Sequence, residues 1–138
     1  MFGDDWSERE KLIWLAGVID CEGSITCSTT RVRVAVTNAR FELLRYIAAN
    51  FGGKVYYRNA RRAEDKWIAE WNIYYFPARN LADQLLPFLL LKREQAELLI
   101  KWVDETWSSS RGKEVTATKF SIRYKIEQQT RRLNKKGA

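Results

Sequence analysis

The sequence predicts an α+β fold in which helices cover one face of a four-stranded antiparallel sheet. Three observations support this prediction. The 138 residues are enough for one globular domain, residues 1–138, with its own hydrophobic core. Two pairs of segments alternate apolar and polar residues with the period of a strand. Segments with helical spacing stand before, between and after them, so the expected order is α-β-β-α-β-β-α, with further helical turns near the C-terminus.

The first helix is expected over residues 7–19. Ser7 and Glu10 have the spacing of a capping box, and Gly23 is placed to end the helix. The apolar stripe of this helix consists of Leu12, Ile13, Leu15, Ala16 and Ile19.

The first hairpin is expected from strands over residues 24–28 and 31–37, with Thr29 and Thr30 in the turn. Valines at positions 32, 34 and 36 alternate with Arg31, Arg33 and Ala35. The pattern predicts a sheet with one apolar face and one open face that is basic and rich in hydroxyl groups.

The later elements follow from the same patterns. A helix over residues 41–51 ends at Gly52 and Gly53, and a second hairpin has strands over residues 54–59 and 67–76, with Pro77 closing the second strand. Helices are expected over residues 78–86 and 92–107, flanking Pro87, and a basic helix over residues 116–134. The tryptophans are expected to pack in the core and in interfaces: Trp6, Trp14, Trp67, Trp71, Trp102 and Trp107.

Charge is segregated along the chain. The net charge of +7 arises from segments of alternating sign: −4 over residues 1–22, +6 over 23–66, −2 over 67–107 and +7 over 108–138. This distribution favours a face that binds a polyanion over a chance basic tail.

Composition excludes several classes of protein. Histidine is absent, which excludes most zinc sites and every imidazole base, and Cys21 and Cys27 are too few for a disulfide framework. No Gly-rich phosphate loop is present. No apolar run approaches the ~20 residues of a membrane span, and no targeting segment is recognisable, so we expect no membrane partner and a cytoplasmic, nucleoid-associated or organellar location.

Two carboxylates stand at the C-terminal end of the first helix, where the helix dipole disfavours anions. Asp20 and Glu22, together with exposed helix carbonyls, make an oxygen-rich site suited to Mg²⁺. Gly17 costs about 1 kcal/mol in a helix interior, which indicates either fraying or the close approach of another backbone.

Residues 15–23 resemble the motif of the LAGLIDADG homing endonucleases, matching six of its nine letters. Val18, Cys21 and Glu22 are the replacements. The resemblance continues at residues 87–98 and 133–137, in the element order of the family.

The resemblance implies a single-motif homodimer whose sheets form a saddle in the DNA major groove. It implies that Glu22 binds the catalytic Mg²⁺, for which Mn²⁺ can substitute, that Asp20 caps the helix end, and that Lys92 lies near the scissile phosphates. A metal-activated water would attack phosphorus, and two sites would cut both strands of a pseudo-palindromic duplex. The dimer interface would comprise Leu12, Leu15, Ala16, Gly17, Ile19 and Asp20.

The open sheet face is expected to read DNA. Candidate contacts are Ser24, Thr26, Ser28, Arg31, Arg33, Asn38, Arg40, Arg58, Arg61, Lys66, Glu70 and Asn72. Relatives often hold a polar side chain where this chain has Ala35, and Asn38 and Arg40 are alternatives for that role. The basic tail, with Arg131, Arg132, Lys135 and Lys136, is expected to contact phosphates. A nucleic-acid binder that does not cleave is the rival function, and Glu22 argues against it.

Overall fold

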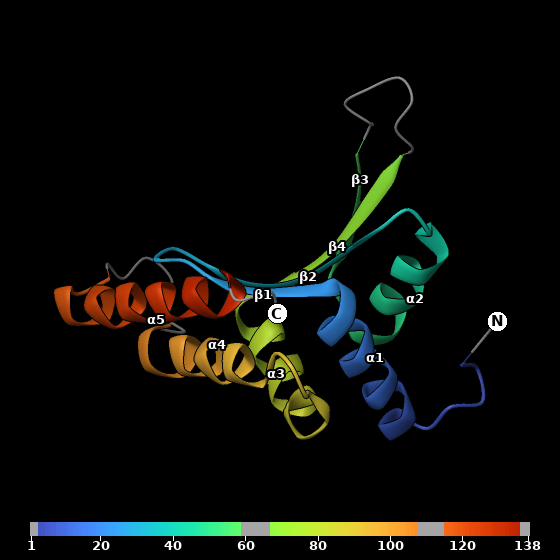
Figure 1. The fold of residues 1–138 in the computed structure, drawn as a ribbon, viewed down its shortest axis with the longest axis horizontal. Coiled ribbons are helices and arrows are strands. Elements are labelled where there is room, and N and C mark those ends of the chain that lie inside the picture. Colours follow the sequence, from blue (N-terminus) through green and yellow to red (C-terminus); the bar gives the residue numbers. More distant parts are fainter. Residues whose placement is uncertain (1–2, 59–66, 108–114, 136–138) are drawn as a thin grey trace.

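The four strands form one antiparallel sheet, as predicted. The computed structural model describes residues 3–58, 67–107 and 115–135. The strands are β1 (Gly23–Cys27), β2 (Val32–Asn38), β3 (Lys54–Arg58) and β4 (Ile68–Tyr74), in the order β1-β2-β4-β3. Figure 1 shows a curved sheet with the helices on one side and the other side open. This arrangement confirms the predicted α+β fold.

The register of the sheet explains its two faces. Val34 pairs with Ile73, and Val36 pairs with Trp71, and all four side chains are buried in the core. Because successive residues point to opposite faces, Arg33 lies on the open side, as predicted.

Helix α1 (Glu8–Glu22) begins with the predicted capping box. The Ser7 hydroxyl accepts a hydrogen bond from the Glu10 backbone at 3.1 Å, and the Glu10 carboxylate accepts one from the Ser7 backbone at 2.9 Å. The helix runs three residues further than expected, so Asp20 and Glu22 lie in its last turn. Gly23 ends the helix, and a Cβ atom there would lie 2.7 Å from the Ile19 Cα, so only glycine fits.

The start of helix α3 differs from the prediction. The strand expected over residues 67–76 ends at Tyr74, and α3 (Tyr75–Leu85) follows at once. Pro77 therefore does not close a strand but lies in the first turn of a helix. A first-turn residue has no intrahelical acceptor for its N–H, so proline is tolerated there.

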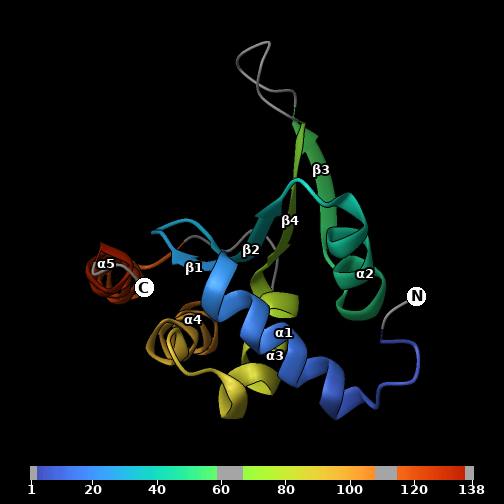
Figure 2. The same cartoon turned by 45° about the vertical axis from the view of Figure 1, so that its right-hand side comes forward.

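The remaining helices are α2 (Phe41–Phe51), the short 3₁₀ helix η1 (Leu86–Phe88), α4 (Arg93–Thr106) and α5 (Ala117–Lys135). Figure 2 shows α1 and α2 next to each other, and Trp14 of α1 packs edge-on against Tyr46 of α2. None of the helices in the described part of the chain has the length and apolar character that a membrane span requires.

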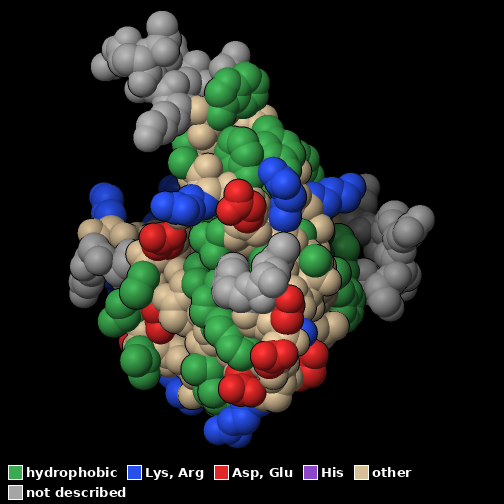
Figure 3. Space-filling model, turned by 90° about the vertical axis from the view of Figure 1, so that its right-hand side faces the viewer, with side chains coloured by type: hydrophobic (Ala, Val, Ile, Leu, Met, Phe, Trp, Pro, Cys, Tyr) green, Lys and Arg blue, Asp and Glu red, His purple; other side chains and the backbone are tan. Residues whose placement is uncertain are grey.

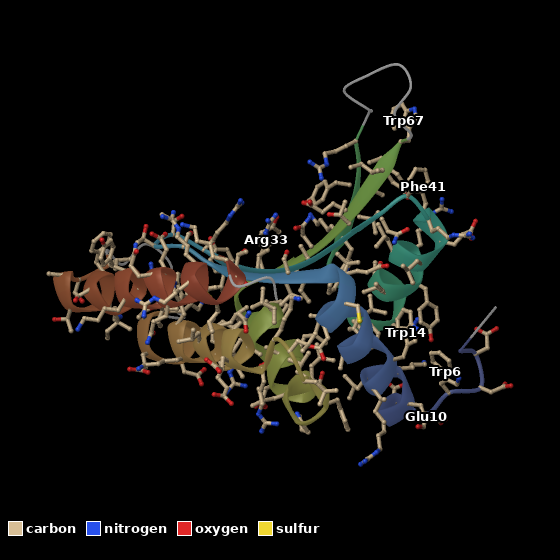
Figure 4. All side chains as sticks on the ribbon, in the orientation of Figure 1. Trp6, Glu10, Trp14, Arg33, Phe41 and Trp67 are labelled. Carbon is tan, nitrogen blue, oxygen red and sulfur yellow. The ribbon has the colours of Figure 1, made fainter. Side chains whose placement is uncertain are left out.

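Most tryptophans pack as predicted, with one exception. Trp71 and Trp102 are fully buried in the core. Trp67, just before strand β4, is instead largely exposed, so it is not part of the core, and packing in an interface stays a prediction for it. The reason is its place at the protruding end of the sheet, where no helix covers it (Figure 4).

Candidate functional site

Glu22 is an exposed carboxylate held in place by one side chain of the sheet. The Asn38 side-chain amide donates a hydrogen bond to Glu22 Oε2 at 3.0 Å. The Arg40 backbone N–H donates to Asn38 Oδ1 at 2.7 Å, which orients that amide. Of the two residues proposed to compensate for Ala35, Asn38 contacts Glu22 directly, and Arg40 acts on Asn38 through its backbone.

The surroundings of Glu22 suit a cation. Among the residues that the structure describes, Glu22 forms no ion pair, and it stands at the helix end that carries partial negative charge. The same residues contain no group of three or more Cys, Asp or Glu side chains that could cage a metal. Mg²⁺ is commonly bound by one or two carboxylates plus water and substrate phosphates. Glu22 therefore fits a site that is completed by other ligands.

Asp20 has a different partner from the one predicted. Its carboxylate, 7% exposed, accepts three backbone hydrogen bonds: from Leu90 at 2.8 Å, from Leu91 at 3.1 Å and from Lys92 at 3.0 Å. Asp20 thus caps the segment that begins α4, rather than the end of its own helix. Anions are stabilised by the free N–H groups near a helix start.

Lys92 is buried, with 3% of its surface exposed. Its Nζ donates a hydrogen bond to the backbone carbonyl of Asp20 at 3.0 Å, in the last turn of α1. A cation in that position offsets the negative end of the helix dipole. The ammonium group therefore binds the chain itself, at the carbonyl two residues before Glu22. The catalytic role of Lys92 stays a prediction.

Glu70 is the centre of a polar network on the open face of the sheet. Its carboxylate binds Arg33 at 3.4 Å, Arg58 at 3.3 Å, and the side chains of Thr37 and Asn72. Burial raises the pKa of the Glu70 carboxyl, but the hydrogen bond from Asn72 and the charge of Arg33 oppose it, and the net pKa lies below the ordinary value. Glu70 is therefore charged and holds both arginines over the sheet.

The structure brings most of the predicted DNA contacts to one face. Cross-strand pairing of β1, β2, β4 and β3 gives the open face Ser24, Thr26, Arg33, Glu70, Asn72 and Arg58. In Figure 4 the Arg33 side chain points away from the helices, into the open side of the curved sheet. Asn38 and Arg40 lie at the end of β2 near Glu22. Arg61 and Lys66 lie outside the described residues.

Two further predicted contacts, Asn72 and Ser28, also have polar groups that bind within the chain. Asn72 is buried, and its amide donates to Glu70 while accepting from Arg33 at 3.2 Å. The Ser28 hydroxyl accepts the backbone N–H of Thr30 and of Arg31. Asn72 positions its neighbours, and Ser28 shapes its turn.

Sequence reasoning missed several residues of the open face, among them Thr37, Lys54 and Tyr56. Each is paired across the sheet with a residue of that face: Thr37 with Glu70, Lys54 with Asn72, and Tyr56 with Glu70. The period-two pattern extended backward from Arg58 could have identified Lys54 and Tyr56. Figure 3 shows hydrophobic side chains at the protruding end of the molecule, above a band of mainly basic ones.

The exposed face of α1 differs from the face that was predicted to form the dimer interface. Leu15, Ala16 and Ile19 have no accessible surface because they pack in the core of their own chain, and Asp20 is tied to α4. Only Leu12, which is partly buried, and Gly17 remain accessible from the predicted set.

The exposed face instead carries Ile13 and Gly17. A Cβ atom at Gly17 would meet nothing within 4 Å. Leu90 and Leu91, 86% and 62% exposed, lie in the loop that Asp20 binds to the end of α1. Leu15, Ala16 and Ile19 therefore belong to the core of their own chain, and the exposed side of α1 carries Ile13 and Gly17.

Comparison with known proteins agrees with the fold. No protein-family model matches the chain, and no curated protein sequence matches it. The homing endonuclease I-CvuI, in complex with the I-CreI target and Mg, superimposes with a TM-score of 0.59 at 19% identity, over 87% of this chain and 94% of that chain. I-CvuI in complex with its own target and Ca gives 0.56 at 22% identity, over 88% and 95%.

The archaeal intron-encoded homing endonuclease I-Vdi141I, complexed with DNA, gives a TM-score of 0.72 at 15% identity, over 92% of this chain and 86% of that chain. The four-stranded antiparallel sheet with its helices is therefore the fold of these homing endonucleases.

Proposed function

We propose that this chain is a homing endonuclease that binds duplex DNA on the open sheet face and, as a homodimer, cleaves both strands with Mg²⁺ at a centre containing Glu22. The observation that carries the proposal is the position of Glu22. It ends α1, which has an exposed apolar face, and it directly precedes Gly23, the first residue of β1. Two copies paired through α1 would bring two Glu22 carboxylates together at the inner end of two open sheet faces.

The charge of the open face supports DNA as the ligand. Arg33, Lys54 and Arg58 provide cations there, and Glu70 balances only one of them. Guanidinium groups over an open sheet can bind phosphates or the acceptor edge of guanine. The DNA complexes formed by the structural neighbours agree with this assignment.

Glu22 and Asn38 are the residues of this chain to which we assign a role in metal binding. Glu22 would supply a carboxylate ligand, and Asn38 would hold that carboxylate in one orientation through its hydrogen bond. A divalent cation bound there would supply Lewis acidity at the scissile phosphate. Arg33 and Arg58 would hold the duplex over the sheet.

The decisive experiment is cleavage of a library of random duplexes in Mg²⁺, followed by sequencing of the cut ends. We expect double-strand cuts within a pseudo-palindromic sequence. Glu22→Gln should abolish cutting, because the amide keeps an oxygen for Asn38 but lacks the charge that binds a cation. Binding of the same duplex in Ca²⁺ should persist.

Glu105→Gln is the matched control, since Glu105 is an exposed glutamate in the last turn of another helix, α4. It should cut as the parent does. Full cutting by Glu22→Gln at ordinary Mg²⁺ would refute the mechanism. Specific binding without cutting by any variant would instead favour the non-cleaving binder.

A further inference from the structure

The turn between β1 and β2 is held from beneath by side chains of three helices. The contacts reach three consecutive residues of the turn, and all of them involve its backbone. Trp102 of α4 donates a hydrogen bond to the Ser28 carbonyl at 2.8 Å, and Tyr75 of α3 donates one to the Thr30 carbonyl at 3.1 Å. Two side chains of α5 bind Thr29 between them: Glu127 accepts its N–H at 3.1 Å, and Arg123 donates to its carbonyl at 3.4 Å.

The turn also fixes its own shape. The Ser28 backbone donates to the Arg31 carbonyl at 2.8 Å. The Ser28 hydroxyl accepts the N–H groups of Thr30 at 3.2 Å and of Arg31 at 3.1 Å. A serine that binds the backbone two and three residues ahead is a common way to stabilise a tight turn.

The supporting side chains are themselves fixed. Arg123 is buried, donates to the hydroxyl and carbonyl oxygens of Thr106 at 2.8 and 3.0 Å, and lies 4.0 Å from the Trp102 ring centroid. The Tyr75 ring stacks on Trp107 at 4.4 Å.

The backbone at Tyr75 adds a second sign of constraint. Its φ of +51° is the left-handed conformation, which a bulky side chain rarely adopts. That conformation joins β4 to α3 and brings the Tyr75 hydroxyl to the turn. Strained residues of this kind are often kept where the surrounding structure requires one geometry.

The turn presents Arg31 to the open side of the sheet. Arg31 is exposed, and its guanidinium carbon lies 5.5 Å from the ring centroid of Tyr74, which pairs with Arg33 on the open face. Six residue steps lead from Glu22 through β1 to Ser28 at the start of this turn, a span of about 20 Å at ~3.3 Å per residue. At ~3.4 Å of DNA helix axis per base pair, Arg31 would thus face bases about six base pairs from the cleavage centre.

We propose that Tyr75, Trp102, Arg123 and Glu127 are positioning residues that preset the β1–β2 turn, so that Arg31 determines base preference far from the cleavage centre. This inference rests on the proposed DNA-binding function. A side chain presented by a preset backbone binds without the free-energy cost of ordering that backbone, so its preference for the matching base is sharper.

Tyr75→Phe is the sharpest test, because it removes only the hydroxyl that binds the Thr30 carbonyl and keeps the ring stacked on Trp107. Tyr57→Phe is the matched control: Tyr57 is in the other hairpin, and its hydroxyl also makes one hydrogen bond, with Arg45 at 3.2 Å. The first measurement is amide hydrogen exchange of the free protein. We expect exchange at Thr30 and Arg31 to be about fivefold faster in Tyr75→Phe, as for the loss of one hydrogen bond, and unchanged in the control.

The second measurement is base preference across a bound duplex library. Arg31→Ala first identifies the positions that Arg31 reads, as those where preference is lost. Tyr75→Phe should weaken preference at those same positions by about three- to tenfold and leave it intact elsewhere, whereas Tyr57→Phe should leave it intact at these positions.

Three results for Tyr75→Phe would overturn the inference without contradicting DNA binding. The first is unchanged amide exchange at Thr30 and Arg31, and the second is faster amide exchange with unchanged base preference. The third is a loss of base preference that is uniform across the bound site. The last is what a purely structural role would give. If the parent protein binds no duplex, both the proposed function and the role of Arg31 in base recognition are wrong. The exchange measurement would then report only the rigidity of the β1–β2 turn.

Discussion

Asp20 and Lys92 bind each other's helix ends. The Asp20 carboxylate accepts the backbone N–H groups of residues 90–92 ahead of α4, and the Lys92 ammonium donates to the Asp20 carbonyl in the last turn of α1. Each charge lies at the helix terminus whose dipole it offsets. This exchange fixes the end of α1, and therefore Glu22, relative to the loop that carries Leu90 and Leu91.

Asp20→Asn is expected to lower the free energy of unfolding by about 2–3 kcal/mol, because three hydrogen bonds to a buried carboxylate are weakened or lost. Urea denaturation measures this difference. Asp83→Asn is the control: Asp83 is exposed and pairs with Arg79 at 3.6 Å, so its loss should cost less than about 0.5 kcal/mol. Equal losses in the two variants would contradict the capping role. The Mg²⁺ requirement for cleavage should not change in Asp20→Asn.

Lys92→Met tests whether the Lys92 amine has a structural or a catalytic role. The methionine keeps most of the buried stem but leaves the Asp20 carbonyl without its donor, so we expect about 1–3 kcal/mol lower stability in the absence of DNA. Lys101→Met, at an exposed position of α4, should have no measurable effect. Unchanged stability together with lost cleavage would show that the amine acts in chemistry rather than in capping.

The sequence predicted the faces of the sheet well because burial leaves a period-two pattern. Val32, Val34 and Val36 are buried as expected, and the cross-strand register then places Arg33 and Asn72 on one open face. Local signals also succeeded at helix starts, where the capping box of Ser7 and Glu10 acts over three residues.

Local sequence patterns did not predict features that depend on contacts between residues far apart in the sequence. The last turn of α1 is stabilised by Lys92, more than seventy positions after Asp20, and no local pattern reports that contact. The same holds for the β1–β2 turn, whose supports Tyr75 and Arg123 come from later helices. The spacing of apolar residues in α1 predicts that this stripe is buried. It does not indicate whether the stripe packs in the core of its own chain or against the helix of a partner. Leu15 and Ile19 prove to be core.

Glu70→Gln should alter how stability depends on pH. The folded pKa of Glu70 lies below its ordinary value of 4.5, so the unfolded chain binds more protons in that range. The stability contributed by the Glu70 charge is complete above the unfolded pKa and is lost as pH falls through the lower, folded pKa. Urea midpoints measured from about pH 6 down to 3 should fall less steeply in Glu70→Gln. Parallel curves would mean that the network with Arg33 and Arg58 contributes nothing.

Gly17→Leu tests the proposed dimer through the exposed stripe of α1. A single chain has space for the new side chain, since a Cβ atom at Gly17 meets nothing within 4 Å, so the variant should fold with parent-like stability. In a dimer packed through α1, leucine would keep the two helices apart, and we expect the dimer dissociation constant to rise at least about tenfold, with cleavage lost in parallel. Ala49→Leu is the control, a small-to-large change at an exposed position of α2. Sedimentation equilibrium of the three proteins gives the constants directly. A Gly17→Leu dimer as tight as the parent's would exclude this face as the interface, and a parent that stays monomeric at all concentrations, on and off DNA, would exclude the homodimer.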